Sequence, residues 1–181
     1  MTRFQSQVLY GLLILTTGLI IAFLSYNPSR TIQYVVAAGM FLSAVFAFIT
    51  SAKSKDSEIR LKYHELQGAG MLAYALAILI YASTFEKFIT VTMAFLLYFG
   101  ITEIIFGFQL LAYKRKTSMP VVVLRMITGV LTALGGVIIL ALAFSDKNTS
   151  LLVAGILIAL SGINFILFAY ATRRPAIPAR N

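Results

Sequence analysis

The chain has 181 residues, of which 60% are hydrophobic and only 12% are charged. Soluble domains average about 45–50% apolar and about 25% charged residues, so this composition argues against both a soluble protein and a disordered one. The formal net charge of +9 is typical of basic loops that face an anionic membrane surface, and nucleic-acid binding is not expected. Since the chain has no cysteine, disulfides, thiolate metal sites and cysteine nucleophiles are excluded.

Apolar stretches long enough to cross a bilayer recur along the whole chain. A membrane helix needs roughly 20 mostly apolar residues, and six stretches meet this need. They lack the polar–apolar alternation of barrel strands. We therefore expect an all-α, polytopic membrane bundle of six transmembrane helices, at about Val8–Ser25, Thr31–Ala52, Leu66–Thr84, Phe88–Tyr113, Val121–Phe144 and Leu151–Thr172.

The distribution of cations predicts how the bundle is oriented. Twelve of the fifteen Lys and Arg residues fall on one predicted side, and only Arg30, Lys87 and Lys147 fall on the other. Positive residues accumulate on the cytoplasmic side of membrane proteins. We expect both termini in the cytoplasm and the lipid bilayer, most simply a bacterial inner (plasma) membrane, as the surroundings.

Glycines recur at a spacing of seven residues, which is two helical turns and places each pair on one helix face. Such small residues allow membrane helices to approach closely. The odd spans carry Gly11 and Gly18, Gly68 and Ala75, and Gly129 and Gly136; the even spans carry Gly39 and Phe46, Gly100 and Gly107, and Gly155 and Gly162. Ala69, Ala73 and Ala77 form a further small-residue ridge on the third span.

The glycine pattern predicts a single membrane domain over residues 1–181. It divides into three tandem helical hairpins of about 55 residues each, at about 8–52, 66–113 and 121–172, followed by a short basic tail at 173–181. In this alignment Gly39, Gly100 and Gly155 are equivalent. The alternative is that glycine is simply common in membrane helices.

Three hairpins, paired glycines, the Asn27-Pro28 exit from the first span and basic inner loops resemble the HdeD-type acid-resistance membrane proteins. The resemblance covers roughly Val8 to Arg174, although the second copy has Ala75 where a glycine is expected. It implies a small inner-membrane protein with a role in stress response and acid tolerance. It supplies no catalytic motif.

One acidic residue, Glu103, lies inside a predicted span, about 15 Å from the inner end. Inserting a carboxylate there costs about 2.5–3.5 kcal/mol, so Glu103 should face the bundle interior and have a partner. Arg125, near the inner end of the fifth span, is the candidate partner. Two interpretations remain open, a structural ion pair and a proton- or ligand-linked role.

Other polar residues recur at matched positions of the repeat. Gln7, His64 and Arg125 each precede the first glycine of an odd span by four residues, while Gln109 and Asn164 follow the first glycine of an even span by nine. We expect an inner-half cluster of His64, Gln67, Glu103 and Arg125, with Gln109 and Asn164 nearby. Alternatively, Arg125 extends its charge to the interface and His64 and Gln7 are solvated at the headgroups.

No phosphate loop, zinc-binding helix motif or nucleophile elbow is present, and one histidine with six acidic residues predicts no metal site or cofactor. We therefore expect no enzyme activity. Two hypotheses follow. The first is a non-enzymatic membrane protein that acts by packing against itself as a homo-oligomer, lipid or a membrane protein partner. The second is a small proton-linked transporter or channel that uses Glu103.

Overall fold

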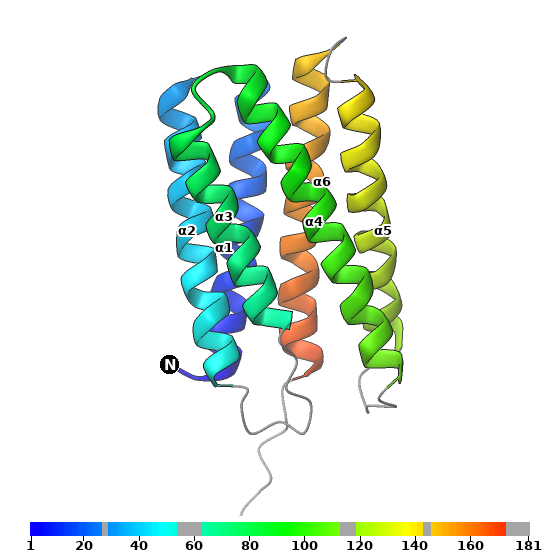
Figure 1. The fold of residues 1–181 in the computed structure, drawn as a ribbon. Helices are drawn as coiled ribbons and strands as arrows, with labels where there is room; N and C mark the ends of the chain where they lie inside the picture. The colour runs from blue at the N-terminus through cyan, green and yellow to red at the C-terminus, as the bar shows by residue number, and fades with distance from the viewer. Residues whose placement is uncertain (27–28, 54–62, 113–118, 143–145, 173–181) are drawn as a thin grey trace, which may run out of the picture.

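The computed structural model describes residues 1–26, 29–53, 63–112, 119–142 and 146–172. These residues form six α-helices and no strand: α1 (Arg3–Leu24), α2 (Arg30–Ala52), α3 (Tyr63–Ile80), α4 (Phe85–Ala112), α5 (Met119–Leu142) and α6 (Lys147–Ala171). The helices run alternately up and down in one bundle, with the N-terminus at the lower end in Figure 1. The predicted tail at 173–181, most of the basic loops and the Asn27-Pro28 turn lie outside the described residues.

Local capping fixes where two of the helices begin. At the start of α1, the Thr2 side chain accepts a hydrogen bond from the Gln5 backbone while the Gln5 side chain bonds back to Thr2. At the start of α6, the Asp146 carboxylate accepts hydrogen bonds from the backbone of Asn148 and Thr149 and from the Thr149 hydroxyl. These bonds hold the pKa of Asp146 below its usual value.

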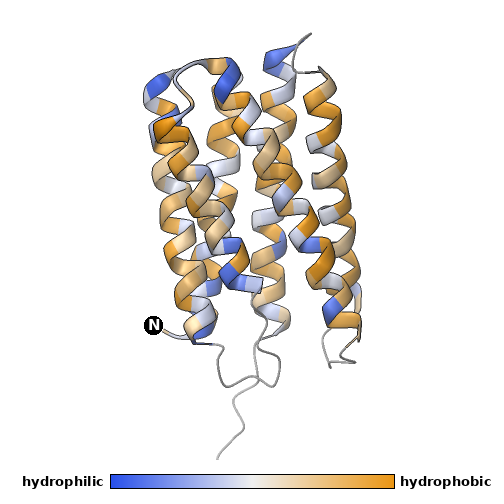
Figure 2. Ribbon diagram, viewed as in Figure 1, coloured by the Kyte–Doolittle hydropathy of each residue, from blue (hydrophilic) through white to orange (hydrophobic). Residues whose placement is uncertain are grey.

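Five of the six helices, α1, α2, α4, α5 and α6, are long and apolar enough to cross a membrane. Helix α3 is not among them, because His64, Glu65 and Gln67 in its first turns lower the mean hydropathy of its 18 residues. Apolar residues cover most of each helix, and hydrophilic residues lie near the two ends and in the lower half of the bundle (Figure 2). The apolar helices indicate an integral membrane protein, with the six predicted spans confirmed for five.

The helices close into a ring, because each packs on its neighbours in sequence and α1 also packs on α6. The most extensive contacts join α1 to α6, α4 to α5 and α2 to α3. These pairs connect different predicted hairpins. The contact between α3 and α4, within one hairpin, is the least extensive between sequential neighbours.

Glycines form the closest of these contacts. A Cβ added to Gly18 would lie 2.4 Å from the Ala159 backbone nitrogen, and one added to Gly155 would lie 2.3 Å from that of Ala22. Gly11 and Gly162 meet in the same way farther along α1 and α6. The two helix backbones therefore touch where any side chain would force them apart.

The glycines of α4 and α5 correct the predicted repeat alignment. Gly100 faces Gly129, the first glycine of α5, whereas Gly155 faces Gly18, the second glycine of α1. The first glycine of α1 is Gly11, and it faces Gly162. Gly100 is therefore equivalent to Gly162, and the predicted equivalence to Gly155 is wrong by seven residues. The error arises because a seven-residue spacing looks the same after a shift of two helical turns.

Candidate functional site

A buried ion pair joins α4 to α5 in the lower half of the bundle. The Nε atom of Arg125 lies 2.5 Å from the Oε2 atom of Glu103, and its Nη2 atom lies 3.2 Å from Oε1. Arg125 is 1% exposed and Glu103 is 3% exposed. Arg125 is therefore the partner that the sequence predicts for Glu103, and the alternative that its charge extends to the interface is wrong.

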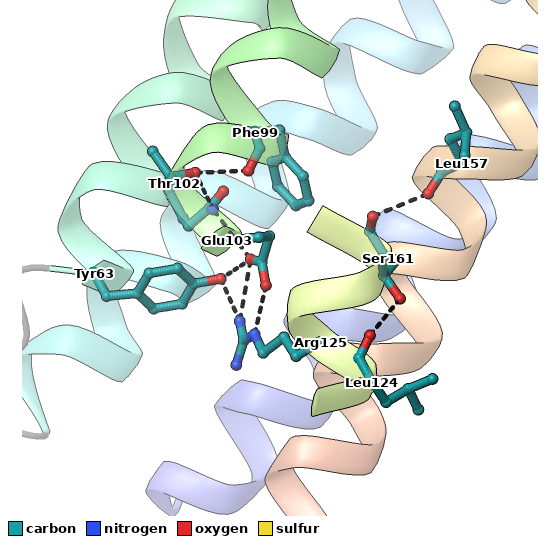
Figure 3. A network of polar contacts seen from close by, with 10 residues as sticks. Tyr63, Phe99, Thr102, Glu103, Leu124, Arg125, Leu157 and Ser161 are labelled. Atoms are coloured by element: carbon teal, nitrogen blue, oxygen red, sulfur yellow. Dashed lines mark hydrogen bonds and ion pairs between the residues drawn. The ribbon is translucent and has the colours of Figure 1, made fainter. Parts of the chain in front are cut away.

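Helix α3 contributes two further groups to the carboxylate (Figure 3). The Tyr63 hydroxyl donates a hydrogen bond to Glu103 Oε1 and accepts one from Arg125 Nη2. The Gln67 amide donates to the Thr102 hydroxyl at 2.5 Å and to Glu103 Oε1 at 3.2 Å. Three helices thus meet at one carboxylate, and charge-assisted hydrogen bonds of this kind are the strong ones.

Aromatic rings surround the Arg125 guanidinium. Its central carbon lies between 4.5 and 4.7 Å from the centroids of four rings, those of Tyr63, Phe106, Phe165 and Phe168. Tyr63 and Phe106 also stack on each other, with their centroids 3.8 Å apart. Cation–π attraction is worth about 2 kcal/mol or more when the cation is desolvated, so the rings compensate part of the cost of burying Arg125.

Several buried polar atoms beside the pair have no hydrogen-bond partner among the described residues. One lies within the pair itself, Arg125 Nη1, and one on its neighbour, Gln67 Oε1. Two more lie toward the starts of α1 and α3: Gln7 Nε2 and His64 Nδ1. Unpartnered buried polar groups are rare in native structures, and each requires an explanation.

The residues around His64 are buried and partly aromatic. His64 is 3% exposed and Gln7 is 2% exposed, so the alternative that both are solvated at the headgroups is wrong. The His64 ring lies edge-on to Tyr63, with centroids 5.2 Å apart, and to Tyr10, with centroids 6.3 Å apart. His64 is thus close to the network through Tyr63.

The predicted cluster is correct in its centre and wrong at one edge. Glu103, Arg125 and Gln67 meet, and Asn164 is buried on α6, although none of the network's hydrogen bonds involves it. Gln109 is exposed on the outer face of α4, so its predicted place near the cluster is wrong. The seven-residue alignment error is the reason, because it matches Gln109 to Asn164.

Two groups of the network are missing from the sequence prediction. With Gly100 aligned to Gly162, the residue two positions after each glycine is Thr102 in α4 and Asn164 in α6, so the corrected repeat identifies Thr102 as a buried polar position. Tyr63 has no comparable signal, because a tyrosine at a helix end is typical of the membrane interface.

Within the described residues, no group of three or more His, Cys, Asp or Glu side chains could hold a metal ion. The site offers instead a carboxylate, a guanidinium, a phenol and an amide, which can bind or exchange protons and small polar groups. Comparison with known proteins finds no matching family model, no matching curated protein and no matching solved structure.

Proposed function

We propose that the protein is a small proton-linked membrane transporter or channel in which the Glu103–Arg125 pair is the switch. The observation that carries the proposal is the ion pair's position: it is buried in an apolar bundle beside polar atoms that have no hydrogen-bond partner among the described residues. Ionisable residues inside membrane helices commonly mark ion and proton pathways.

Energetics favour a hydrated interior over a dry one. Each buried polar atom without a hydrogen bond costs about 1–3 kcal/mol, and water that bridges such groups removes this cost. The four unpartnered atoms extend from Gln7 and His64, near the starts of α1 and α3, to Gln67 and Arg125. We infer that water connects them as a polar route from one end of the bundle to the ion pair.

The switch follows from the charges. Glu103 accepts hydrogen bonds from α3 and α5, and bonds to a charged carboxylate are stronger than bonds to a neutral carboxyl group, so protonation weakens both connections. Arg125, Tyr63, His64 and Tyr10 are the titratable groups nearest to Glu103, and Arg125 is the cation that protonation would leave without its counter-charge. The three helices then separate more easily.

The unpartnered atoms of Gln7 and His64 lie toward the end of the bundle where α1, α3 and α5 begin. We propose that this end faces the cytoplasm of a bacterial inner membrane, with both termini inside, because most of the chain's cations belong to segments at that end. Reporter fusions test the orientation, and an external C-terminus would contradict it.

Replacing Glu103 by glutamine tests the proton-linked function. Glu103→Gln keeps the side-chain shape and removes the charge and the titration. In vesicles that contain the purified protein and a pH-sensitive dye, we expect proton flux to fall at least ten-fold, since a removed proton-relay group contributes about 10²–10⁴-fold in comparable proton-transfer steps.

Glu86→Gln is the matched control for this experiment. Glu86 is exposed at the start of α4 and pairs with Lys147 at 2.6 Å. Like Glu103, it lies on α4 and belongs to an ion pair, but it is not buried. Its flux should equal that of the unmodified protein. Equal flux in Glu103→Gln and the unmodified protein, with both folded, would exclude the proposed function.

A second candidate is a non-enzymatic role in acid or stress tolerance, as in the HdeD-type proteins that the sequence resembles, through packing against a partner. The observation in its favour is the ridge of Ala69, Ala73 and Ala77, which remains partly uncovered on α3. Against it, all twelve glycines contact atoms of the same chain, so their closest packing is already used within one copy. Disulfide crosslinking of Ala73→Cys in native membranes tests this candidate, and absence of a crosslinked product would exclude this ridge as the contact.

A further inference from the structure

An open groove lies between α3 and α4, on the outer surface of the bundle. Its volume is about 410 Å³. Small side chains form its two walls, Ala69, Ala73 and Ala77 on α3 and Val91 and Ala94 on α4. The groove occurs where two sequential helices pack least extensively. Because it opens on the outer surface of an apolar bundle, we expect it to face the hydrocarbon of the bilayer.

Aromatic side chains close the groove at its back and at its lower end. Tyr74 and Phe95 stack at its back, with ring centroids 4.4 Å apart. At the lower end, the Tyr98 ring lies against Gly70, where an added Cβ would collide with it, and the Tyr98 hydroxyl donates to the Leu66 carbonyl at 2.6 Å. Tyr98 is therefore held in place as the floor of the groove.

A cation lies at the upper end. Lys87 precedes Val91 by four residues and Ala94 by seven, so it lies on the same face of α4 as the groove wall. Its Nζ atom is 3.3 Å from the Ser83 hydroxyl and 5.0 Å from the centroid of the Tyr81 ring. Neither of the ion pairs among the described residues includes Lys87, so its charge is available to an anion at the membrane surface.

The distance from Lys87 to the lower end of the groove matches one leaflet of the bilayer. Lys87 and Tyr98 are separated by eleven residues, or about 16 Å at 1.5 Å per residue. The hydrocarbon core of a bilayer is about 30 Å thick, so each leaflet contributes about 15 Å. We propose that the groove binds an anionic phospholipid, with one acyl chain between α3 and α4 and the phosphate at Lys87.

A second helix is the other occupant to consider, and its width and the charge at Lys87 argue against it. A helix is about 10 Å across. An acyl chain is thinner than a helix and enters without separating α3 from α4, and Lys87 adds the charge that a neutral apolar partner would not use.

Native mass spectrometry of the purified full chain in detergent tests the proposal. The probes are phosphatidylglycerol and phosphatidylcholine with identical acyl chains, added at equal concentration. We expect one phosphatidylglycerol to bind more tightly than phosphatidylcholine. Lys87→Gln should reduce this preference about five-fold, since one basic residue near the membrane surface is worth about that factor.

Arg30→Gln is the matched charge control. Arg30 lies at the same end of the bundle, and its Nε atom donates to the Tyr34 hydroxyl at 2.9 Å, so it too is a cation beside a tyrosine, but on α2 and not on a wall of this groove. Ala94→Leu fills the groove and should reduce binding of both lipids at least ten-fold. Ala38→Leu, on the exposed surface of α2, is its control and should change neither.

Two outcomes would overturn the proposal. One is unchanged lipid binding in Ala94→Leu, with the variant folded as shown by its thermal unfolding. The other is efficient disulfide crosslinking of Ala73→Cys between two copies in native membranes, which would assign the groove to a second copy of the chain. Proton flux is measured separately, so loss of the lipid site and failure of the Glu103 mechanism are distinguishable.

Discussion

Replacement of Arg125 by glutamine is expected to destabilise the folded protein by about 3–5 kcal/mol, the cost of removing one partner of a buried ion pair. The variant leaves Glu103 only 3% exposed with no counter-charge, and removes the guanidinium from four aromatic rings. Unfolding in mixed detergent micelles with increasing sodium dodecyl sulfate, followed by circular dichroism, measures the loss.

The double variant Glu103→Gln/Arg125→Gln separates the lost charge pair from the lost packing. Because no uncompensated charge remains, it should recover at least half of the stability that Arg125→Gln loses. Lys147→Gln breaks the exposed pair with Glu86 and should leave the unfolding curve unchanged, since exposed ion pairs contribute little. A curve for Arg125→Gln that coincides with the Lys147→Gln curve would contradict a stabilising pair.

The second large effect is expected at the contact between α1 and α6. In Gly18→Ala, the new methyl group would lie 2.4 Å from the backbone nitrogen of Ala159, and a backbone atom inside a helix cannot rotate away. Overpacking costs about 1–3 kcal/mol when side chains can adjust, so we expect a net loss of about 2 kcal/mol or more in the same unfolding assay.

Gly135→Ala is the matched control for the glycine contact. There the methyl group would meet the tip of the Leu157 side chain, the Cδ1 atom at 2.3 Å, which can change rotamer. Alanine is favoured over glycine in helices by about 1 kcal/mol, so this variant should be neutral or slightly stabilising. Equal destabilisation by the two substitutions would show that backbone contact is not what makes Gly18 necessary.

Hydropathy and glycine spacing predict the helices well. Each described helix matches one predicted span, because long apolar segments leave a membrane chain few alternatives to helices. The first turns of α3 are the exception. Tyr63 and Gln67 there are buried and bond to Glu103, so the mean hydropathy of α3 falls although the helix remains part of the ring.

The central pair of the site can be predicted from the free-energy cost of burying a charge in a membrane. A carboxylate within a span requires a cation, and Arg125 is the candidate at comparable depth. The rest depends on three-dimensional packing. Tyr63 joins the pair across α3, and Phe165 and Phe168 reach it from α6, at sequence distances that no local spacing encodes. The repeat could have supplied Thr102, but only in the register that the α4–α5 contact reveals.

Thiol labelling at Gln67 tests most directly whether water reaches the Glu103–Arg125 pair. The chain has no cysteine, so Gln67→Cys provides a single reactive thiol beside Glu103. Ile78→Cys, on the same helix and also buried, is the control. We predict that a small charged thiol reagent, added to the cytoplasmic side of native membranes, labels Gln67→Cys and not Ile78→Cys. Equal resistance of both thiols in the folded protein would contradict a hydrated route to the pair.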